Sequence, residues 1–451
     1  MQRSLLRRIL IFVSEREILA DTITPILAFQ ALASHASACL LESVERGGRL
    51  SRYSFIGLDF TESRSFTSHK NVASDIRSYV QKHRPDGALA SHGGSLIFAS
   101  YDASAPFAGI ATPTHTGVPD VFVAIPAVWL IFDHFTHQLR VWCCAENERA
   151  ASARIDDCVA RLYAEHPHEL GTIRATTPVT ASLSRDEYLE RVDRAQRAIC
   201  DGEVYQLQLG IRFQTMIEGD PFDIYRTIRS RNPSPYMFYL RTDFGIMLGA
   251  SPEFLVRLEG RTARLRPLAG TRPRGSTDEE DLQIAEELLA NEKERAEHVM
   301  LVDLGRNDIG AVCEFGTVHI TELLQVERYS HVMHIVSEVN GILRDDCDGI
   351  DLFFAGFPAG TVTGTPKVRA MQLINEYEPV ARGFYAGSIG RISFDGDFDS
   401  CISLRGMIVQ DGKVSWQASA GIVADSDPSA EYDEVLHKTR IARSVLGVTY
   451  P

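Results

Sequence analysis

The chain has 451 residues, a formal net charge of −14 and a hydrophobic content of 44%. This length suggests one large domain or two ordinary domains, with enough apolar residues for a buried core. The acidic balance argues against a general nucleic-acid-binding protein, because such proteins neutralise phosphates with surplus lysine and arginine. It does not exclude an anionic small substrate, because local cations or a bound metal can dominate one site.

The cysteines and the apolar runs indicate a cytoplasmic protein without membrane contact. The 8 cysteines are scattered, and none has the paired spacing of a zinc site, so we expect free thiols in a reducing compartment. The run Ile9–Val13 follows a basic N-terminus but is too short for a signal peptide, and we expect a first strand there. The longest apolar run, Val121–Phe132, contains Pro126 and is too short to span a bilayer.

The first part of the chain, residues 1–165, mixes short β-rich runs with loops. Residues 166–183 contain proline, glycine and several threonines, and are predicted to be a linker. Ser184 and Glu187 have the spacing of a helix capping box, and apolar residues follow with helical period. We therefore place the start of a second, larger domain at residue 184 and extend it to residue 451.

Predicted helices and strands are mixed throughout residues 184–451. A turn and strand are expected at Gly202–Phe213, and Thr277–Leu301 has the pattern of one charged amphipathic helix. Thr365-Pro366 is predicted to open another helix, with threonine as the cap and proline at the first helical position. Asp395-Gly396 is a hairpin turn signal. The mixture predicts an α+β fold rather than a regularly alternating parallel sheet.

Two predicted helices each carry carboxylates on one face. Glu294 and Glu297 are three residues apart, and Glu431 and Glu434 repeat this spacing, with Lys438 one turn further. If the two faces meet, the four carboxylates need a cation, and Mg²⁺ prefers a few carboxylates together with water and substrate oxygens. The alternative is a solvated helix surface with ion pairs between residues four apart, such as Glu434–Lys438.

Three further segments contain candidate binding groups. Gly360–Lys367 is a glycine-rich loop before a helix, where free backbone N–H groups suit an anion, although an ordinary capped turn is equally consistent. Its glycine spacing is not that of a Walker loop. Arg266–Gly275 is unusually basic for an acidic protein and could bind an anion or form an exposed turn. His334 lies in a strand-like apolar run, where structural histidines are more common than catalytic ones.

Five segments together resemble the chorismate-utilising enzymes, and among them anthranilate synthase component I. The match covers most of residues 184–447 and part of the N-terminal region. It implies the fold of that family, with β-sheets sandwiched by helices, and the conversion of chorismate and ammonia to anthranilate and pyruvate with Mg²⁺. The matching segments are Pro267–Gly275, Lys293–Asp308, His334–Val339, Phe357–Met371 and Ala420–Asp425.

The resemblance also assigns roles to the candidate residues. Glu297 and Glu434 would hold Mg²⁺ against the ring carboxylate of chorismate, with Glu294 and Glu431 as nearby or water-bridged partners. Chorismate is a dianion, and arginine gives directional contacts to a carboxylate. The remaining substrate contacts would come from Tyr385, Arg405 and the backbone near Ala420 and Gly421 for the enolpyruvyl carboxylate, Lys438 beside the metal, and Thr271, Gly270 and Thr361 around the ring.

The chemistry requires attack at ring C2 and loss of the C4 hydroxyl, which leaves poorly without a general acid. Glu253 stands where the family places that acid, and His334 is the family's candidate for assisting the later loss of pyruvate. Members that add water have a lysine base where this chain has Gln206. Members that make 4-amino-4-deoxychorismate have a nucleophilic lysine where this chain has Ala269. Both positions favour ammonia attacking directly at C2.

We expect a separate glutamine amidotransferase to supply the ammonia, because no cysteine sits in a glycine-flanked nucleophile turn and the chain leaves no room for a fused glutaminase. The resemblance also includes a feedback site for L-tryptophan in the N-terminal region, although plain core packing is an alternative. An apolar pocket with a few polar contacts suits an indole amino acid. The residues concerned are Leu41, Glu42, Ser43, Arg52, Asn232, Pro233, Tyr236 and Met237.

Several positions near the substrate loops depart from the family's usual pattern, namely Gly210, Gly406, residues 363–365 and residues 93–102. These changes leave room for an enzyme that stops at 2-amino-2-deoxyisochorismate, without the lyase step. Isochorismate, salicylate or aminodeoxychorismate synthesis is less favoured. A rival outside the enzymes is an inactive tryptophan-sensing subunit, against which the intact metal and substrate residues argue.

Overall fold

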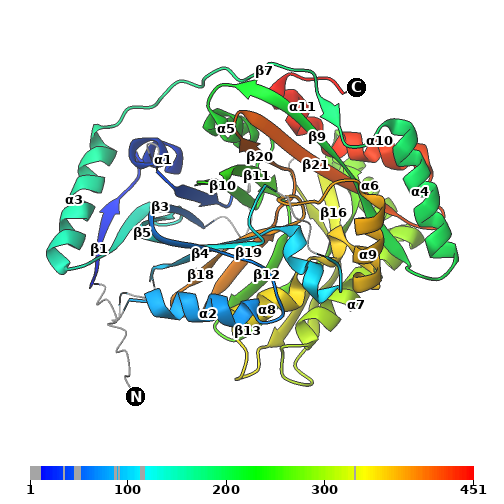
Figure 1. Cartoon of the computed structure of the whole chain (residues 1–451), viewed down its shortest axis with the longest axis horizontal. Coiled ribbons are helices and arrows are strands. Elements are labelled where there is room, and N and C mark those ends of the chain that lie inside the picture. The colour runs from blue at the N-terminus through cyan, green and yellow to red at the C-terminus, as the bar shows by residue number, and fades with distance from the viewer. Residues whose placement is uncertain are drawn as a thin grey trace.

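The computed structural model describes residues 12–33, 36–44, 52–85, 89, 92–111, 117–329 and 332–450. Two layers of antiparallel strands form its centre (Figure 1). In the hydrogen-bonded order, the first layer consists of β1 (Phe12–Leu19), β6 (Gln138–Ala145), β5 (Val121–Asp133), β3 (Tyr53–Phe66), β2 (Ala38–Glu42), β10 (Tyr236–Thr242), β11 (Gly245–Ser251), β20 (Gly406–Gln410), β21 (Lys413–Ile422) and β9 (Gln206–Glu218).

Strand β5 also begins the second layer, because its first residues pair with β4 while its whole length pairs with β3. The order continues through β4 (Gly94–Ala99), β18 (Ser388–Ser393), β19 (Phe398–Ile402), β12 (Phe254–Glu259), β13 (Thr262–Leu265) and β16 (Val332–Ile342), with β14 (Leu268–Pro273) and β15 (His319–Arg328) both beside β16. Three short strands pair with β9: β7 (Arg174–Ala175), β8 (Thr180–Ala181) and β17 (Gly364–Thr365).

Helices surround the two layers, with α3 at one end of the molecule and α4 and α10 at the other (Figure 1). The helices are α1 (Pro25–Leu32), α2 (Val72–His83), η2 (Tyr101–Phe107), α3 (Glu148–Ala164), α4 (Arg185–Cys200), α5 (Pro221–Arg231), α6 (Asp278–Ala290), α7 (Glu292–Gly310), α8 (Gly349–Gly356), η3 (Gly360–Val362), α9 (Lys367–Tyr377), α10 (Pro428–Lys438) and α11 (Arg440–Leu446). This arrangement confirms the predicted α+β fold.

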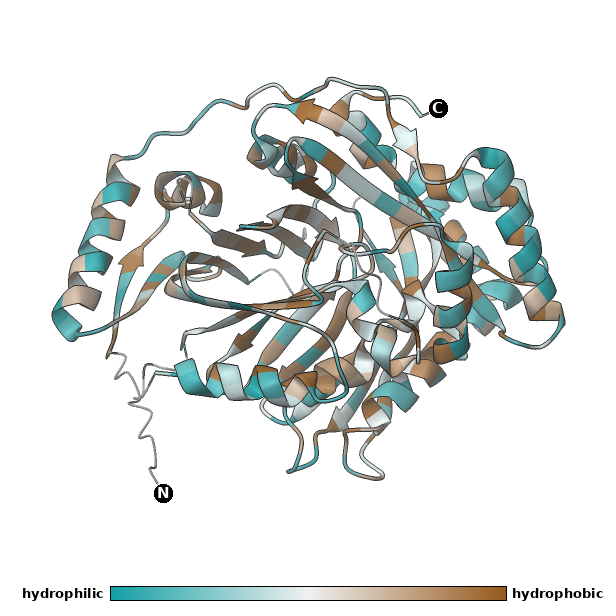
Figure 2. Cartoon of the chain, in the orientation of Figure 1, coloured by the Kyte–Doolittle hydropathy of each residue, from teal (hydrophilic) through white to brown (hydrophobic). Residues whose placement is uncertain are grey.

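Two apolar clusters stabilise the arrangement by removing hydrocarbon surface from water. One fills the space between the layers, where Trp129 and Phe238 of the first layer share a cluster with Phe98 and Phe398 of the second. The other packs the opposite face of the first layer against helices, for example Tyr188 of α4. The central strands are accordingly mostly brown in Figure 2, whereas the outward faces of α3 and α4 are largely teal.

Local sequence signals set several element boundaries as predicted. Ser184 and Glu187 form the reciprocal capping box of α4, and Asp395-Gly396 lies in the turn between β18 and β19. Strand β9 follows the turn at Gly202, as expected. The expected first strand is β1, which includes Val13, whereas residues 9–11 lie outside the described part of the chain.

Two helix predictions need correction. The segment Thr277–Leu301 is not one helix, because Asn291 ends α6 and caps α7, accepting a hydrogen bond from the Glu294 backbone N–H at 3.0 Å. An asparagine side chain competes with the helical backbone in this way. Thr365 does not cap α9 either, since it belongs to β17 and Pro366 occupies the cap position without a side-chain hydrogen bond.

The predicted linker at residues 166–183 carries the chain from α3 across the molecule to the start of α4 (Figure 1). It contributes β7 and β8, both paired with β9. Strands from either side of it share sheets, because β2 pairs with β10 and β4 pairs with β18. Residues 166–183 therefore connect two parts of the chain whose strands pair with each other.

The thiols of all 8 cysteines are free, as the sequence predicted. In the part of the chain that the structure describes, no helix is both long and apolar enough to cross a membrane.

Candidate active site

The candidate residues from distant segments meet where β9 and β21 of the first layer approach β14 and β16 of the second. Helix α7 joins the two layers there, because the Gln206 Nε2 of β9 donates to the Glu297 Oε1 of α7 at 2.7 Å. From the other side, Arg405 and Lys438 lie close enough to His334 of β16 to affect its charge. The structure therefore brings these five sequence-predicted residues into one region.

His334 is a buried and neutral imidazole. Its pKa is lowered to about 4, first by burial and then by the positive charges of Arg405 and Lys438. Its Nδ1 lies 3.0 Å from the Gly270 carbonyl oxygen and 3.0 Å from the Thr271 Oγ1. A carbonyl oxygen only accepts, so we assign the proton of the neutral ring to Nδ1, which leaves an unprotonated Nε2 able to accept a proton.

Arg405 is a cation without a counter-ion. No described residue hydrogen-bonds to its guanidinium or forms an ion pair with it. Burial lowers its pKa, which means that the fold disfavours this charge in the absence of an anion. Its backbone has a φ of 46° and precedes Gly406, where a Cβ would meet the Phe384 ring at 2.9 Å. Such an arginine is suited to receive a carboxylate from a ligand.

A hydrogen-bond network connects three more candidate positions on the same side of the site. The Tyr385 hydroxyl lies 2.7 Å from the Ser419 Oγ, which donates to the Gln208 Oε1 at 2.7 Å. The Lys438 Nζ donates to the Ser419 carbonyl at 2.9 Å and pairs with Glu434 at 2.7 Å. The Glu434–Lys438 ion pair expected of a solvated helix surface is thus present, but Lys438 also contacts the strand that lines the site.

The strand that carries Ala420 and Gly421 approaches these side chains closely. Ala420 is fully buried opposite Leu209 of β9. A Cβ at Gly421 would lie 2.7 Å from the Gln206 Nε2 and 2.9 Å from the Gln208 Nε2, so only glycine leaves room for both glutamines.

The four candidate metal-binding carboxylates are distributed over α7 and α10. Burial raises the pKa of Glu297, and the negative charges of Glu294 and Glu434 raise it further. Burial and the Glu434 charge also raise the pKa of Glu431, which accepts a hydrogen bond from Ser426 at 2.7 Å. Glu294 is paired with Arg272 at 3.0 Å. The carboxylates therefore repel one another across the site.

Mg²⁺ fits this donor set in one specific way. Among the described residues, no three His, Cys, Asp or Glu side chains converge closely enough to hold a metal by themselves. Mg²⁺ usually keeps several waters and binds one or two carboxylates together with substrate oxygens. The mutual repulsion at Glu297 is relieved by a cation, so Glu297 and Glu434 suit an ion that is completed by substrate and water.

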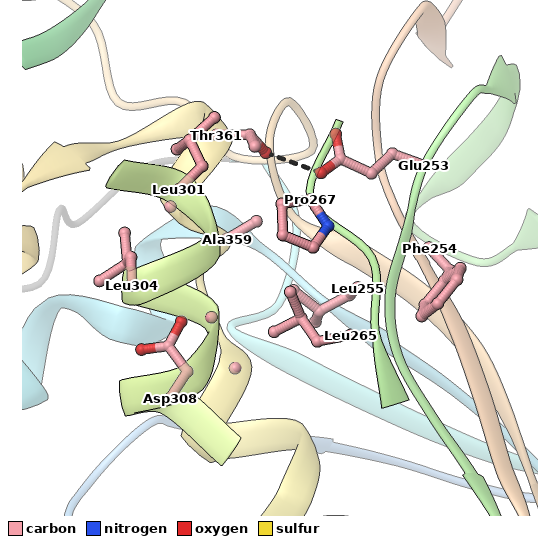
Figure 3. Close-up of a pocket in the computed structure, with 13 residues that line it drawn as sticks. Glu253, Phe254, Leu255, Leu265, Pro267, Leu301, Leu304, Asp308, Ala359 and Thr361 are labelled. Atoms are coloured by element: carbon pink, nitrogen blue, oxygen red, sulfur yellow. Dashed lines mark hydrogen bonds between the residues drawn. The ribbon is translucent and has the colours of Figure 1, made fainter. Parts of the chain in front are cut away.

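Glu253 is a buried carboxyl group without a cation partner. Burial raises its pKa to about 8, although the hydrogen bond from the Thr361 Oγ1 at 3.1 Å acts in the opposite direction. Figure 3 shows the two side chains at one end of a narrow cavity whose walls, including Leu301 and Leu304, are largely apolar. This environment keeps Glu253 protonated at neutral pH, which is the state a general acid needs.

The first two residues of the glycine-rich loop Gly360–Lys367 line this cavity, and the lysine at the end of the loop is paired. Lys367 forms an ion pair with Asp308 of α7 at 2.7 Å. Burial raises the pKa of Asp308 to about 6, against the effect of Lys367. The loop therefore fixes Thr361 against Glu253 and anchors α9 to α7, rather than presenting its lysine to an anion.

Most candidate feedback residues lie at the ends of β2 and β10, which pair through Met237 and Glu42, whereas Arg52 directly precedes β3. The Glu42 carboxylate accepts hydrogen bonds from Tyr225 at 2.6 Å and from Arg229 at 2.9 Å and 3.0 Å. These contacts make it a structural group rather than a free ligand-binding group.

The other feedback candidates differ in their contacts. Arg52 is paired with Asp133 at 2.7 Å, and the Tyr236 hydroxyl donates to Asp399 at 2.8 Å. Asn232 and Pro233 are half-buried and directly precede β10. The Ser43 hydroxyl is buried with no partner among the described residues.

Sequence reasoning missed three residues that complete the site. Gln208 and Ser419 lie on the same strand faces as Gln206 and Gly421, and the alternation of strand side chains could have identified them. The Tyr329 ring packs edge-on against His334, with the centroids 5.6 Å apart. No local pattern marks Tyr329, because its contact arises from the pairing of β15 with β16.

Comparisons with known proteins agree over most of the chain. The profile of the chorismate binding enzyme family matches residues 39–444. Anthranilate synthase component 1 of Streptomyces coelicolor is 42% identical, covering 94% of this chain and 87% of that protein. The Thermus thermophilus protein of the same name is also 42% identical, covering 94% and 95%.

Solved structures give the same result for the fold. Anthranilate synthase component I from Streptococcus pneumoniae superposes with a TM-score of 0.79 at 31% identity, covering 95% of this chain and 99% of that chain. The menaquinone-specific isochorismate synthase from Escherichia coli superposes with a TM-score of 0.79 at 21% identity, covering 97% and 94%. The second likeness concerns the fold alone.

Proposed function

The chain belongs to the chorismate-binding enzyme family, and on this premise we propose that it converts chorismate and ammonia to anthranilate, pyruvate and water, as the synthase component of anthranilate synthase. The observation that carries the proposal is Arg405, a cation without a counter-ion beside neutral His334. A dianionic substrate would supply the missing charge. Relatives about 40% identical over nearly the whole chain bear the same component name.

Arg405 and Tyr385 would hold the enolpyruvyl carboxylate of chorismate. The Arg405 guanidinium would bind it through paired hydrogen bonds. The Tyr385 hydroxyl would add a third donor by exchanging its hydrogen bond to Ser419 for one to the substrate. The backbone at Ala420 and Gly421 would complete this pocket. The ring would rest near Gly270, Thr271 and Thr361, and Lys438 would add positive charge at the acidic side of the site.

Glu297 and Glu434 would hold Mg²⁺, with Glu294 and Glu431 near its water ligands. The bound ion would neutralise the ring carboxylate and draw electron density from the ring, which favours attack at C2. Support comes from the raised pKa of Glu297, which burial and the neighbouring carboxylates Glu294 and Glu434 cause. The same arrangement argues against an inactive tryptophan-sensing subunit. Repulsion between neighbouring carboxylates lowers stability, and a subunit that binds no metal would gain nothing in return.

The first half-reaction forms a C–N bond at C2 and breaks the C–O bond at C4. Glu253 would donate its proton to the departing C4 hydroxyl, which leaves as water, and Thr361 would orient the acid. Ammonia needs no activating base, and Gln206 provides none because a carboxamide does not titrate. The same two facts disfavour isochorismate and salicylate synthesis, which require activated water, and Ala269 disfavours aminodeoxychorismate synthesis.

The second half-reaction removes pyruvate and makes the ring aromatic. His334 would accept the proton from C2 at its unprotonated Nε2, and the C–H electron pair would complete the aromatic ring as the C3–O bond breaks. Pyruvate would leave as its enolate and take up a proton from the imidazolium or from water. Support comes from the tautomer that Gly270 imposes and from the lowered pKa of about 4, which keeps the imidazole neutral. Retention of this residue favours the full reaction over an enzyme that stops at 2-amino-2-deoxyisochorismate.

Ammonia would come from a separate glutamine amidotransferase, and tryptophan would inhibit the enzyme. The name "component 1" of the relatives implies a second component. For tryptophan, support comes from the unpartnered Ser43 hydroxyl near the half-buried Asn232 and Pro233, which together offer polar contacts at the edge of an apolar core. We expect a reducing, cytoplasmic location because all 8 cysteines are free.

The proposal is tested by mixing the purified chain with chorismate, Mg²⁺ and ammonium and identifying the products by mass and fluorescence. We expect anthranilate and pyruvate, lost on chelation of Mg²⁺ and in the variant Glu434→Gln. An aminated product that retains its pyruvyl group would mean that the lyase step is absent. Isochorismate or salicylate would show that Gln206 does not exclude water, and would overturn the proposal.

A further inference from the structure

A second cavity, of about 170 Å³, is lined by residues outside the set of candidate active-site residues. It lies between η2, the end of α9 and the following residues 379–382. Asn375 and Pro379 are exposed at its mouth, whereas Tyr101, Asp102 and Arg382 are buried at its inner end. The cavity therefore runs from the surface toward the interior.

The inner end of this cavity contains polar groups that lack partners. The Tyr101 hydroxyl is buried and has no hydrogen-bond partner among the described residues, and Tyr101 as a whole is 6% exposed. Asp102 is also 6% exposed. Its Oδ2 accepts from the Gly383 N–H at 2.6 Å, but no described donor reaches its Oδ1. The buried Tyr101 hydroxyl is costly to leave unpaired unless a ligand or water in the cavity forms a hydrogen bond with it.

The other charges around the cavity are already neutralised. Arg382 donates to both oxygens of Glu378, at 3.0 Å and 2.7 Å, and to the carbonyls of Val362 and Gln208. Arg212 lies behind this pair and donates to the Ala381 carbonyl. Of the two carboxylates that line this cavity, Glu378 is paired with Arg382, whereas Asp102 has no ion-pair partner among the described residues.

A row of glutamines connects this cavity to the carboxylates of the active site. Gln417 donates to Glu378 at 3.2 Å, and its Oε1 is buried without a described partner. Gln208 lies on the same strand face, two residues from Gln206. The Gln206 Oε1 is again buried without a described partner, next to Glu297.

Gly210 leaves the space that this row occupies. It lies between Gln208 and Arg212 on β9, and a Cβ there would meet the Gln417 Nε2 at 2.8 Å and the Glu378 Oε1 at 3.2 Å. A serine at this position would displace the Gln417 side chain, so the glycine permits the continuous row from the cavity to Gln206.

We propose that this cavity is the uptake site for ammonia, which then passes along Gln417 and Gln208 to Gln206. The inference rests on the proposed function, which requires a small nitrogen nucleophile at Gln206. Ammonium and ammonia are donors, and the cavity and the row present acceptors without donors at Tyr101, Asp102, Gln417 and Gln206. Chorismate is a dianion and is repelled by the Asp102 carboxylate, so we infer that the two substrates reach the centre by different routes.

The first test fills the rim of the cavity with Val380→Trp. With saturating chorismate and Mg²⁺, we expect the KM for ammonium to rise about tenfold or more, with the KM for chorismate unchanged, because only one substrate loses access. Val368→Trp is the matched control, since Val368 is 50% exposed on α9 and does not line the cavity. An ammonium KM in Val380→Trp within about twofold of that control would overturn the proposal.

A second variant avoids added bulk. Asp102→Asn keeps an oxygen for the Gly383 N–H but removes the negative charge, and we expect a severalfold rise in the KM for ammonium alone. Thermal unfolding of both variants identifies a misfolded protein. If Val380→Trp fails to fold, Asp102→Asn decides, and an unchanged ammonium KM there overturns the proposal.

Two further arms separate the sources of ammonia and the two proposals. Glutamine with a glutaminase subunit replaces ammonium in the first arm: a matching loss in Val380→Trp assigns the cavity to delivered ammonia as well as to free ammonium, and a loss with ammonium alone assigns it to the free form. In the second arm, crystals are soaked in rubidium, a cation similar in size to ammonium.

The rubidium result does not depend on activity. If the wild-type chain aminates nothing, the proposed function fails, and an anomalous peak between Asp102 and Tyr101 would still support an ammonium-sized site. Water alone in the cavity of these crystals would then overturn the uptake site.

Discussion

Two buried glutamates show how differently the catalytic region and the N-terminal region use the same chemistry. Glu253 has one hydroxyl partner and no cation, and burial raises its pKa to about 8. Glu42 has Tyr225 on one oxygen and Arg229 on both. The arginines repeat the contrast, since the Arg405 guanidinium has no described partner while Arg229 donates two hydrogen bonds to Glu42.

This difference indicates that a ligand is expected beside the unpartnered groups of the catalytic region. A polar group that the fold leaves without a partner costs free energy, and this cost is tolerated where a ligand or transition state removes it. Groups that the fold satisfies contribute to stability instead. Substitutions in the catalytic region should therefore change activity with little loss of stability, and substitutions at Glu42 should do the reverse.

The largest effect is expected for Glu253→Gln. Loss of the general acid should lower kcat about 10³-fold with little change in the KM for chorismate. The variant and wild type are compared by steady-state kinetics. In the wild type, kcat/KM should fall as the pH rises through about 8, the pKa of Glu253.

The same variant checks the sign of the stability effect. The folded state raises the pKa of Glu253, so it favours the protonated form. Its contribution to stability is complete below the pKa of an unfolded glutamate, about 4, and is lost as the pH rises through about 8. Glu253→Gln stays neutral, so its melting temperature should exceed that of the wild type increasingly from about pH 5 to about pH 9. The opposite trend would contradict the assigned protonation state.

Arg405→Gln should have the next largest effect. Removal of one partner of a buried carboxylate contact costs about 3–4 kcal/mol, or several hundredfold in kcat/KM for chorismate. Because the wild-type cation has no described counter-ion, its loss should leave the melting temperature unchanged or raise it. A clear drop in melting temperature with unchanged kinetics would assign Arg405 to the fold rather than to the substrate.

Glu42→Gln should reverse this pattern. The substitution leaves the partly exposed Arg229 without its counter-charge and removes the charged acceptor of the buried Tyr225 hydroxyl. It should lower the free energy of unfolding by about 1–3 kcal/mol, while kcat at saturating substrates is retained. Chemical denaturation and steady-state kinetics measure the two quantities. A stable variant with a damaged active site would break the contrast between the two regions.

Ser43→Ala should give the smallest effect on stability, within about 0.5 kcal/mol, because its hydroxyl has no described partner to lose. We expect the variant to lose inhibition by tryptophan, measured by titration of the anthranilate-forming rate. A wild-type enzyme without inhibition at millimolar tryptophan would remove the feedback site from the proposal.

The sequence alone determined the features that depend on neighbouring residues along the chain. The capping box of Ser184 and Glu187, the turn at Asp395-Gly396 and the α+β class follow from local preferences and period, and the structure confirms them. The family also followed from the sequence, because motifs retain their order along the chain. The break at Asn291 was missed because one polar residue in a helical pattern carries too weak a signal.

Only the tertiary structure decided how the site is charged. The protonated state of Glu253, the neutral state of His334 and the unpaired state of Arg405 each depend on burial and on partners that are far away in the sequence. The glutamine row required the register of β9 against β21, which a sequence does not specify. Electrostatic free energy depends on distance in space and on exclusion of water, and both are set only when the strands and helices pack.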